Sequence, residues 1–518
     1  MNKRMKLRAA LTAISCLWIP AQLCLSETIL DLPRLCIDEI LDKITSKSLS
    51  CLNVTEYFLD RIRRYNPILN AVITLDETGA LGRAKELDKY FRESGALRGR
   101  LHCVPVLVKD NIRVKGLPMT LGLAVFENSI PDSDAPVVER IREAGAVVLG
   151  KANMAPLALG TPHDPSQMGG LARNPYAMNY TAATSSNGNA AALSARLAVL
   201  GIASDSFGSV TGPATVTRVV GYRPPTDAFD MSGVFPLRGP VFDTIGLMAL
   251  RVKDVRILSE VVSMQSVPDS DDPDIDMTPL PQTLIRVGIL GNVTYGRVSN
   301  KYGRYTLNRD VQDVFWTFEN DLRALDNVSV DLTWDDEIVA LTFILAIDFT
   351  SSCTCMSEWM SMFWSAYPMF ASNTDQRIGN LTDLIEAGLC VDDSGMPVRC
   401  DKSMVSGDWQ NWISLCSSKT NLCQSQDSVA MSHLRKAQRR LKKTLFSKFD
   451  VIVFTQNPQT VMRTHKDVPI GFTEAGQEQS FPVSAYFLTT PKKTPLMLAV
   501  AERYEKMFWA PTAPLSFT

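Results

Sequence analysis

An apolar segment that runs into a turn of small residues constrains the fold of this chain more than any other stretch. Residues 200–205 read LGIASD, which is typical of a buried strand, and residues 206–214 read SFGSVTGPA. A turn of this kind can hold one hydroxyl group, that of Ser209, at the rim of a sheet with backbone N–H groups beside it. We therefore expect a sheet with a reactive serine, Ser209, at its edge.

A second apolar segment ends in a lysine. Residues 104–109 read VPVLVK, and such a continuous apolar run predicts a strand that is covered on both faces. Two interpretations of Lys109 are open. Burial would disfavour the charged amine and lower its pKa, so that Lys109 acts as a general base near neutral pH. Alternatively, Lys109 lies just past the strand end, where it is hydrated and paired with Asp110.

The order of the elements around these segments indicates an α/β fold. A helix is expected over residues 137–146 and a strand over 147–151, so a β–α–β order includes the strand at 104–109. The Ala-rich residues 190–200 predict a packed helix whose N-terminus faces residues 185–188, where free N–H groups favour an anion. A mixed, twisted sheet flanked by helices is the expected architecture.

Hydrophobic periodicity places the remaining elements. Helices are expected over residues 34–66 with a break at 46–50, and over 79–95, 311–325 and 496–507. Strands are expected over residues 70–74, 283–290, 449–454 and 481–487. The helix over 311–325 is expected to turn four apolar residues inward, namely Val314, Phe315, Phe318 and Leu322.

The N-terminus has the pattern of a secretory signal peptide. Residues 1–8 are basic, and residues 9–26 are apolar with small residues near their end. We expect cleavage near Ser26, a single domain over residues 27–518 and a secreted protein. An uncleaved anchor is the alternative, but the apolar run is short and Pro20 interrupts it. No later segment is long and apolar enough to span a bilayer, so stable membrane insertion is not expected.

Cysteines agree with passage through an oxidising compartment. The sequence holds 11 cysteines, and six of them gather at irregular spacing, which favours disulfides over a zinc site. These six are Cys353, Cys355, Cys390, Cys400, Cys416 and Cys423. Cys36 and Cys51 flank the first helix and are candidates for a pair, which would leave Cys103 as the odd thiol.

Five glycosylation motifs point to the same route. An Asn-x-Ser/Thr triplet accepts an N-linked glycan only where it is exposed. The triplets begin at Asn53, Asn179, Asn292, Asn327 and Asn380.

The composition excludes strong charge-driven partners. The net charge is only −2, so no nucleic-acid partner is expected. Residues 432–448 predict a basic helix, which we interpret as a hydrated helix face. The aromatic residues between 359 and 370 are interpreted as core rather than as the wall of a pocket. A homodimer is left open.

Three of these segments together resemble the amidase signature family. In that family a lysine ends a strand reading like P-v-x-v-K-D, a serine lies in a loop like G-G-S-S-G-G-S, and a nucleophilic serine lies in G-x-D-x-G-G-S. The corresponding residues here are Lys109, Ser185 and Ser209, which follow one another after 76 and 24 residues. Further matches occur at residues 145–154, 168–176, 212–214, 243–246 and 252–255.

The resemblance implies an amidase-signature fold, with a signature core at about residues 97–260 and a variable substrate-pocket region at about 283–450. It also implies hydrolysis of a non-peptide carbon–nitrogen bond in a small-molecule amide. Lys109 would be the base, Ser185 the proton relay and Ser209 the nucleophile that forms an acyl-enzyme. Backbone N–H groups of Ser206, Phe207, Gly208 and Ser209 would form the oxyanion hole. No metal or organic cofactor is implied.

The chain also departs from the family pattern. Ala183, Thr184, Asn187 and Phe207 replace family glycines, and Thr211 replaces an arginine that often follows the nucleophile. Two other functions therefore stay open. One is a catalytically silent member that binds an acyl or amide ligand, and the other is an acyltransferase in which an amine accepts the acyl group from the same serine.

Overall fold

The computed structural model describes most of the expected core and part of the remainder. The described residues are 36–158, 165–206, 208–226, 228–236, 243–263, 284–291, 297–300, 303–306, 309–333, 390–391, 397–398, 443–455 and 485–508. The expected signal peptide, Phe207, the aromatic residues between 359 and 370, and five of the six clustered cysteines lie outside these residues. Most of the expected basic helix over 432–448 lies outside them as well.

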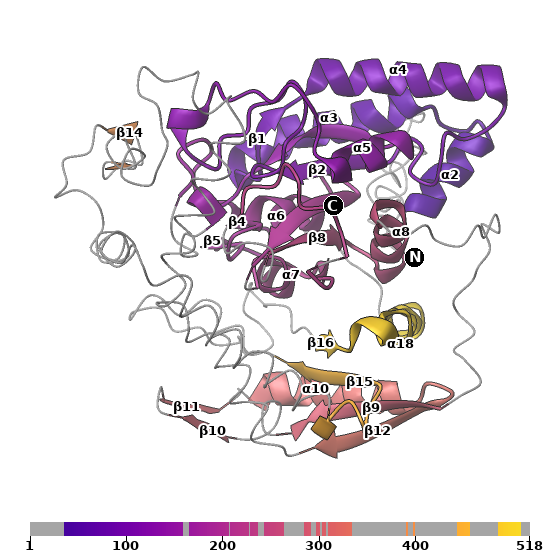
Figure 1. The fold of residues 1–518 in the computed structure, drawn as a ribbon, viewed down its shortest axis with the longest axis vertical. Helices are drawn as coiled ribbons and strands as arrows, with labels where there is room; N and C mark the ends of the chain where they lie inside the picture. The colour runs from indigo at the N-terminus through magenta and orange to yellow at the C-terminus, as the bar shows by residue number, and fades with distance from the viewer. Residues whose placement is uncertain are drawn as a thin grey trace, which may run out of the picture.

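A six-stranded mixed sheet forms the centre of the N-terminal half (Figure 1). Its strand order is β1-β3-β2-β6-β8-β7. Strands β3, β2 and β6 are parallel, whereas β1, β8 and β7 each run antiparallel to a neighbour. The strands are β1 (Val72–Leu75), β2 (Pro105–Lys109), β3 (Val147–Ala152), β6 (Leu200–Asp205), β7 (Val220–Tyr222) and β8 (Thr244–Ala249). The expected mixed α/β sheet is confirmed.

The continuous apolar strands are buried on both faces. Every residue of β2, β3, β6 and β8 is buried, as strands covered by helices on both faces require. Register places Val106 opposite Leu200 and Val108 opposite Ile202. Because β2 and β6 are parallel, their carboxyl ends lie at the same edge of the sheet.

Helices cover this sheet, and several have clear start and stop signals. Ser50 caps α3 by accepting from the N–H of Asn53, and Asp76 caps α4 by accepting from the N–H of Gly79. Gly95 ends α4 in the left-handed conformation. The helices are α2 (Ile37–Thr45), α3 (Cys51–Leu69), α4 (Glu77–Ser94), α5 (Pro136–Glu143), α6 (Asn187–Ser194), α7 (Thr211–Thr217) and α8 (Val252–Val262).

The helix expected over residues 190–200 is shorter and begins earlier than the Ala-rich pattern indicated. It starts at Asn187 and ends at Ser194, and β6 begins at Leu200. Arg196 in the connection has a φ of 58°, which a continuing helix does not allow. The helix N-terminus therefore lies two residues after Ser185.

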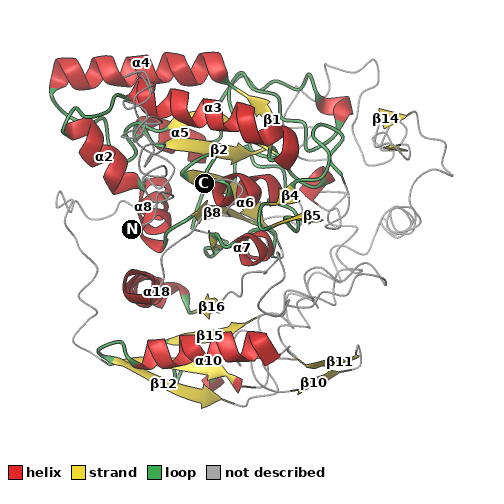
Figure 2. Ribbon diagram, turned by 180° about the vertical axis from the view of Figure 1, so that it is seen from behind, coloured by secondary structure: helices red, strands yellow, loops and turns green. Residues whose placement is uncertain are grey.

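A second, four-stranded sheet contains four strands of the C-terminal half and is separate from the first sheet. Its order is β12-β9-β15-β16, with β12 and β15 parallel to β9, and β16 antiparallel to β15. The elements are β9 (Ile285–Leu290), α10 (Arg309–Arg323), β12 (Val328–Thr333), β15 (Val451–Thr455), β16 (Ala485–Leu488) and α18 (Thr494–Phe508). Figure 2 shows α18 between α8 and this sheet.

Helix α10 packs its aromatic face onto the second sheet. Phe315, Phe318 and Leu322 are buried, as expected, and Phe318 contacts Tyr504 of α18. Val314 is 50% exposed, so its expected inward position is wrong. The buried stripe follows 315, 318 and 322, and Val314 lies beside it.

Short strands and 3-10 turns complete the described part of the chain. The strands pair as antiparallel hairpins, β4 (Arg173–Asn174) with β5 (Ala177–Thr181), β10 (Arg297–Asn300) with β11 (Gly303–Thr306), and β13 (Cys390–Val391) with β14 (Pro397–Val398). The turns are η3 (Ala124–Phe126), η4 (Pro156–Ala158) and η5 (Pro491–Lys493). Within the described ranges, no helix has the length and apolar character needed to cross a bilayer.

The cysteine pairing differs from the expected one. Cys51 is paired with Cys103, while Cys36 is a buried free thiol. Cys51 begins α3, and this end of the helix packs against the segment that leads into β2, so Cys103 lies closer to Cys51 than sequence distance indicates.

His102 lies beside the paired cysteines, and its hydrogen bonds favour a disulfide over a metal site. The Nε2 atom is 3.6 Å from Cys51 Sγ, while Nδ1 accepts from the N–H of Arg98. Burial lowers the pKa of His102 to about 4, so the ring is neutral at pH 7. With Nδ1 accepting, the ring proton is on Nε2, which is therefore not free to bind a metal.

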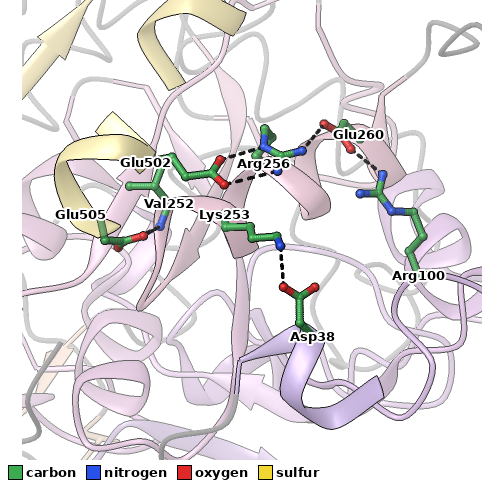
Figure 3. Close-up of polar contacts among 8 residues, drawn as sticks. All are labelled: Asp38, Arg100, Val252, Lys253, Arg256, Glu260, Glu502 and Glu505. Atoms are coloured by element: carbon green, nitrogen blue, oxygen red, sulfur yellow. Dashed lines mark hydrogen bonds and ion pairs between the residues drawn. The ribbon is translucent and has the colours of Figure 1, made fainter. Parts of the chain in front are cut away.

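Polar contacts attach α18 to α8, and α8 in turn contacts Arg100 in the segment after α4 (Figure 3). Arg256 of α8 donates to Glu502 of α18 at 2.9 Å, and it also pairs with Glu260, which contacts Arg100. Glu505 accepts from the N–H of Val252 at the start of α8. These bonds hold the last described helix against the first sheet's helical layer.

Two carboxyl groups in this region are buried with few positive partners. Asp254 is 3% exposed and accepts from the N–H of Ile37, and Glu505 is 8% exposed. Burial raises the pKa of Asp254 to about 7 and that of Glu505 to about 8. At these two groups the folded protein therefore binds more protons than the unfolded chain between about pH 4 and pH 8, so their contribution to stability falls as pH rises through this window.

Asp254→Asn is expected to stabilise the protein more at pH 8 than at pH 4.5, by roughly 2 kcal/mol in the free energy of unfolding. The amide oxygen can still accept from Ile37 N–H, and the cost of the buried negative charge is removed. Denaturant unfolding at the two pH values measures the difference. Asp38→Asn is the control, because Asp38 forms an exposed ion pair with Lys253 that contributes little. An equal gain at both pH values for Asp254→Asn would contradict the prediction.

Candidate functional site

The carboxyl ends of β2 and β6 bring together side chains that are far apart in sequence. Lys109 is the last residue of β2 and is fully buried, as is Ser185. The Nζ atom of Lys109 donates to Ser185 Oγ at 2.8 Å. It also lies 3.0 Å from Ser204 Oγ and 3.3 Å from Ser204 O on β6. Two of the three expected catalytic residues are therefore in direct hydrogen-bond contact.

Burial makes Lys109 a weaker base than an ordinary lysine, and so more often neutral. It lowers the pKa of Lys109 to about 7, although the carboxylates of Asp205 and Asp243 act in the opposite direction. Near neutral pH a large fraction of the amine is uncharged and can accept a proton. Of the two interpretations of Lys109, the structure selects burial.

Asp110 is not the partner of Lys109. Its carboxylate forms a buried ion pair with Lys151 of β3, with 3.3 Å between Oδ1 and Nζ, and it accepts from Thr120. Both members of the pair are fully buried. Lys151 belongs to one of the matching sequence segments, but the pattern alone gave it no role. The pair fixes the chain immediately after Lys109.

The loop that carries Ser185 has an unusual backbone. The Thr184–Ser185 peptide bond is cis, and Ala183 has a φ of 63°, in the left-handed region where glycine is preferred. Alanine thus adopts the conformation that a family glycine would adopt freely. Gly188 cannot be replaced in the same way, because a Cβ atom there would lie 2.3 Å from the backbone nitrogen of Asn153.

Asp205 organises the turn that carries Ser209. Its carboxylate accepts from the N–H of Gly208 at 2.8 Å and from that of Val210 at 2.7 Å, and it pairs with Arg223 at 3.0 Å. Gly208 has a φ of 93°, which favours glycine. Arg223, just after β7, was not predicted from the sequence. The carboxylate thereby folds the turn around Ser209.

Ser209 differs from Lys109 and Ser185 in being partly exposed. Its carbonyl oxygen accepts from the N–H of Ser186 at 3.1 Å, which ties the two serine segments together. Among the described residues there is no hydrogen bond between the hydroxyl groups of Ser185 and Ser209. The arrangement is thus a buried amine, a buried hydroxyl in contact with it, and a more accessible hydroxyl on an adjoining turn.

The expected oxyanion-hole residues are only partly described. The N–H of Gly208 is donated to Asp205, so in this conformation it points into the turn. Ser206, directly after β6, is buried, and Phe207 lies outside the described residues. Ser206 and Ser209 therefore supply the described N–H groups that are candidates to face a substrate oxygen.

Three glycosylation candidates lie on the surface. Asn53, Asn179 and Asn327 are exposed, and Asn292 and Asn380 lie outside the described residues. The side chain of Asn53 takes part in the cap of α3, where its Oδ1 accepts from Ser50. Asn327 lies in the turn between α10 and β12.

Sequence comparison finds a family and a number of relatives. The Amidase family model matches residues 53–476. A glutamyl-tRNA(Gln) amidotransferase subunit of Thermoanaerobacter pseudethanolicus is 33% identical over 249 residues, which are 48% of this chain and 50% of that protein. The corresponding subunit of Archaeoglobus fulgidus is 34% identical over 258 residues, 50% of this chain and 54% of that protein. The chain thus spans about half the length of these curated relatives.

Solved structures share the fold over nearly the whole chain. Peptide amidase from Stenotrophomonas maltophilia aligns with a TM-score of 0.70 at 22% identity, covering 92% of this chain and 98% of that one. An amidase family protein from Bacillus anthracis aligns with a TM-score of 0.72 at 24% identity, covering 93% of each chain. At these identities the likeness establishes the fold.

Proposed function

Because the chain belongs to the amidase family, we propose that it is an amidase that hydrolyses a non-peptide carbon–nitrogen bond in a small-molecule amide. The observation that carries the proposal is the 2.8 Å contact between Lys109 Nζ and Ser185 Oγ. These two side chains are 76 residues apart in sequence and fully buried. A buried lysine is costly, so its position beside a buried hydroxyl favours a chemical role.

The proposed reaction begins with proton transfer along the three residues. Neutral Lys109 takes the proton of Ser185, Ser185 takes the proton of Ser209, and Ser209 Oγ forms a bond to the amide carbon. The carbonyl electron pair moves to the oxygen, which accepts from backbone N–H groups of the turn. When the C–N bond breaks, the leaving nitrogen takes a proton from Ser185, which Lys109 resupplies. Water then releases the acid from Ser209.

Product analysis tests this proposal. The protein is incubated with a panel of small primary and secondary amides, and the released amine and acid are quantified by mass spectrometry. Equal amounts of amine and acid are expected, together with fluorophosphonate labelling of Ser209. An acylated amine formed when an acceptor amine is added, with no acid released in its absence, would indicate an acyltransferase instead. A folded protein that gives neither product nor label would indicate a silent ligand binder.

We also propose that the protein enters the secretory pathway. Support comes from the basic and apolar N-terminal residues 1–26, the paired Cys51 and Cys103, and three exposed glycosylation motifs. Protein collected from the medium of an expressing eukaryotic cell should lose mass on treatment with an N-glycosidase. Retention of the protein inside the cell with an unmodified N-terminus would count against this proposal.

A further inference from the structure

Two polar side chains beside Lys109 have no part in the proposed proton relay. Ser204, near the end of β6, is 7% exposed, and Asn111, two residues after Lys109, is 1% exposed. Ser204 Oγ is 3.0 Å from Lys109 Nζ, and Asn111 Nδ2 donates to the same Oγ at 2.9 Å. The three side chains therefore form one buried chain of hydrogen bonds.

The backbone fixes the orientation of the Asn111 amide. Its Nδ2 also donates to the carbonyl oxygen of Phe235 at 3.3 Å, and a carbonyl can only accept. In the opposite direction, Phe235 N–H donates to the carbonyl of Asn111 at 2.8 Å. The amide nitrogen must therefore face Ser204, where it occupies one lone pair of the hydroxyl oxygen and holds its rotamer.

The number of oxygens around Lys109 Nζ equals the number of N–H donors that the charged amine has. An ammonium group has three N–H donors and no acceptor. Lys109 Nζ has three oxygens within reach, Ser185 Oγ at 2.8 Å, Ser204 Oγ at 3.0 Å and Ser204 O at 3.3 Å. Each N–H of the ammonium can therefore be satisfied in a site where an unpaired donor would be costly.

We propose that Ser204, oriented by Asn111, is a positioning residue that receives two of the three N–H groups of Lys109 once the amine has taken the proton of Ser185. The inference rests on the proposed function, because it takes Lys109 as the base. In this step one proton moves from Ser185 Oγ to the lone pair of Lys109 Nζ, and no other bond is broken. Asp205 and Asp243 favour the same charged product from further away.

A titration of Lys109 tests this role without requiring turnover. The protein is labelled with lysine carrying ¹³C at Cε, and the Lys109 signal is assigned by its loss in Lys109→Met. In Ser204→Ala the titration midpoint is expected to fall by about one pH unit, because an acceptor of the charged form is lost. Ser204→Thr keeps the hydroxyl and should restore the wild-type midpoint. Asn111→Asp should raise it, since a carboxylate favours the ammonium.

A buried serine away from Nζ is the control. Ser194 of α6 is 2% exposed, and Ser194→Ala should leave the Lys109 midpoint unchanged. An unchanged midpoint in Ser204→Ala, or an equal shift in Ser194→Ala, would overturn the proposal. If the amidase proposal alone fails, wild-type protein releases no product while the Ser204→Ala shift persists. If both hold, the acid limb of kcat/KM moves with the titration midpoint.

Discussion

Ser209→Ala is expected to lower amide turnover by about 10⁴-fold or more while the fold is kept. Ser209 is partly exposed, whereas the other two residues of the proposed relay, Ser185 and Lys109, are fully buried. The contact that Ser209 makes within the protein uses its carbonyl oxygen, which accepts from Ser186 N–H and is retained in alanine. Single-turnover product release measures the loss, and thermal unfolding verifies the fold.

Two further measurements sharpen the assignment of Ser209. Fluorophosphonate labelling should disappear in Ser209→Ala, and peptide mapping of the wild type should place the label on the peptide that contains residue 209. Ser209→Cys keeps a nucleophile of similar size and should retain partial labelling by a thiol-reactive acyl analogue. Turnover at the wild-type rate in a well-folded Ser209→Ala protein would rule Ser209 out as the nucleophile.

The site was predictable where local sequence patterns fix local structure. The apolar runs before Lys109 and Asp205 specify buried strands, and both strands form with every residue buried. In the structure these two strands are parallel neighbours that end at the same edge, which brings the lysine and the serine turn close together. Burial of Lys109 was one of two outcomes that the sequence left open, because a lysine one residue past the strand end would have been exposed to water.

Features that depend on distant contacts were not predictable. The sequence offered Cys36 as a neighbour of Cys51 along the chain, yet packing of α3 against the segment before β2 selects Cys103. The second sheet depends on the pairing of β9 with β15, which are separated by most of the C-terminal half. No local pattern states which of two sheets a strand will join.

Polar residues inside buried strands and turns were the missed signal at the site. Ser204 follows four apolar or glycine residues in its strand, and Asn111 is two residues after Lys109. A buried polar side chain needs a partner, so each of these residues marks a hydrogen-bond network. Their partners, Lys109 and Phe235, could be identified only from the folded structure.

Lys109→Met is expected to abolish turnover and to remove fluorophosphonate labelling of Ser209, because the relay loses its proton acceptor. In the wild type, the pKa of Lys109 is about 7, and only the neutral amine is a base. The kcat/KM of the wild type should therefore rise about tenfold per pH unit below pH 7 and level off above it. A pH-independent wild-type rate between pH 5 and 8 would contradict the role of Lys109.

The same substitution is expected to stabilise the protein, by roughly 3 kcal/mol at pH 6. The folded pKa of Lys109 is about 7, below the ordinary lysine value of 10.5, so between these values the unfolded chain binds more protons. The contribution of Lys109 to wild-type stability therefore rises with pH across this window, and the full cost of its buried charge is present below pH 7. The advantage of Lys109→Met should shrink as pH increases from 7 toward 10. Denaturant unfolding at pH 6 and pH 9 measures this difference in stability between the variant and the wild type. If Lys109→Met is less stable than the wild type at pH 6, the hydrogen bonds to Ser185 and Ser204 outweigh the cost of burial.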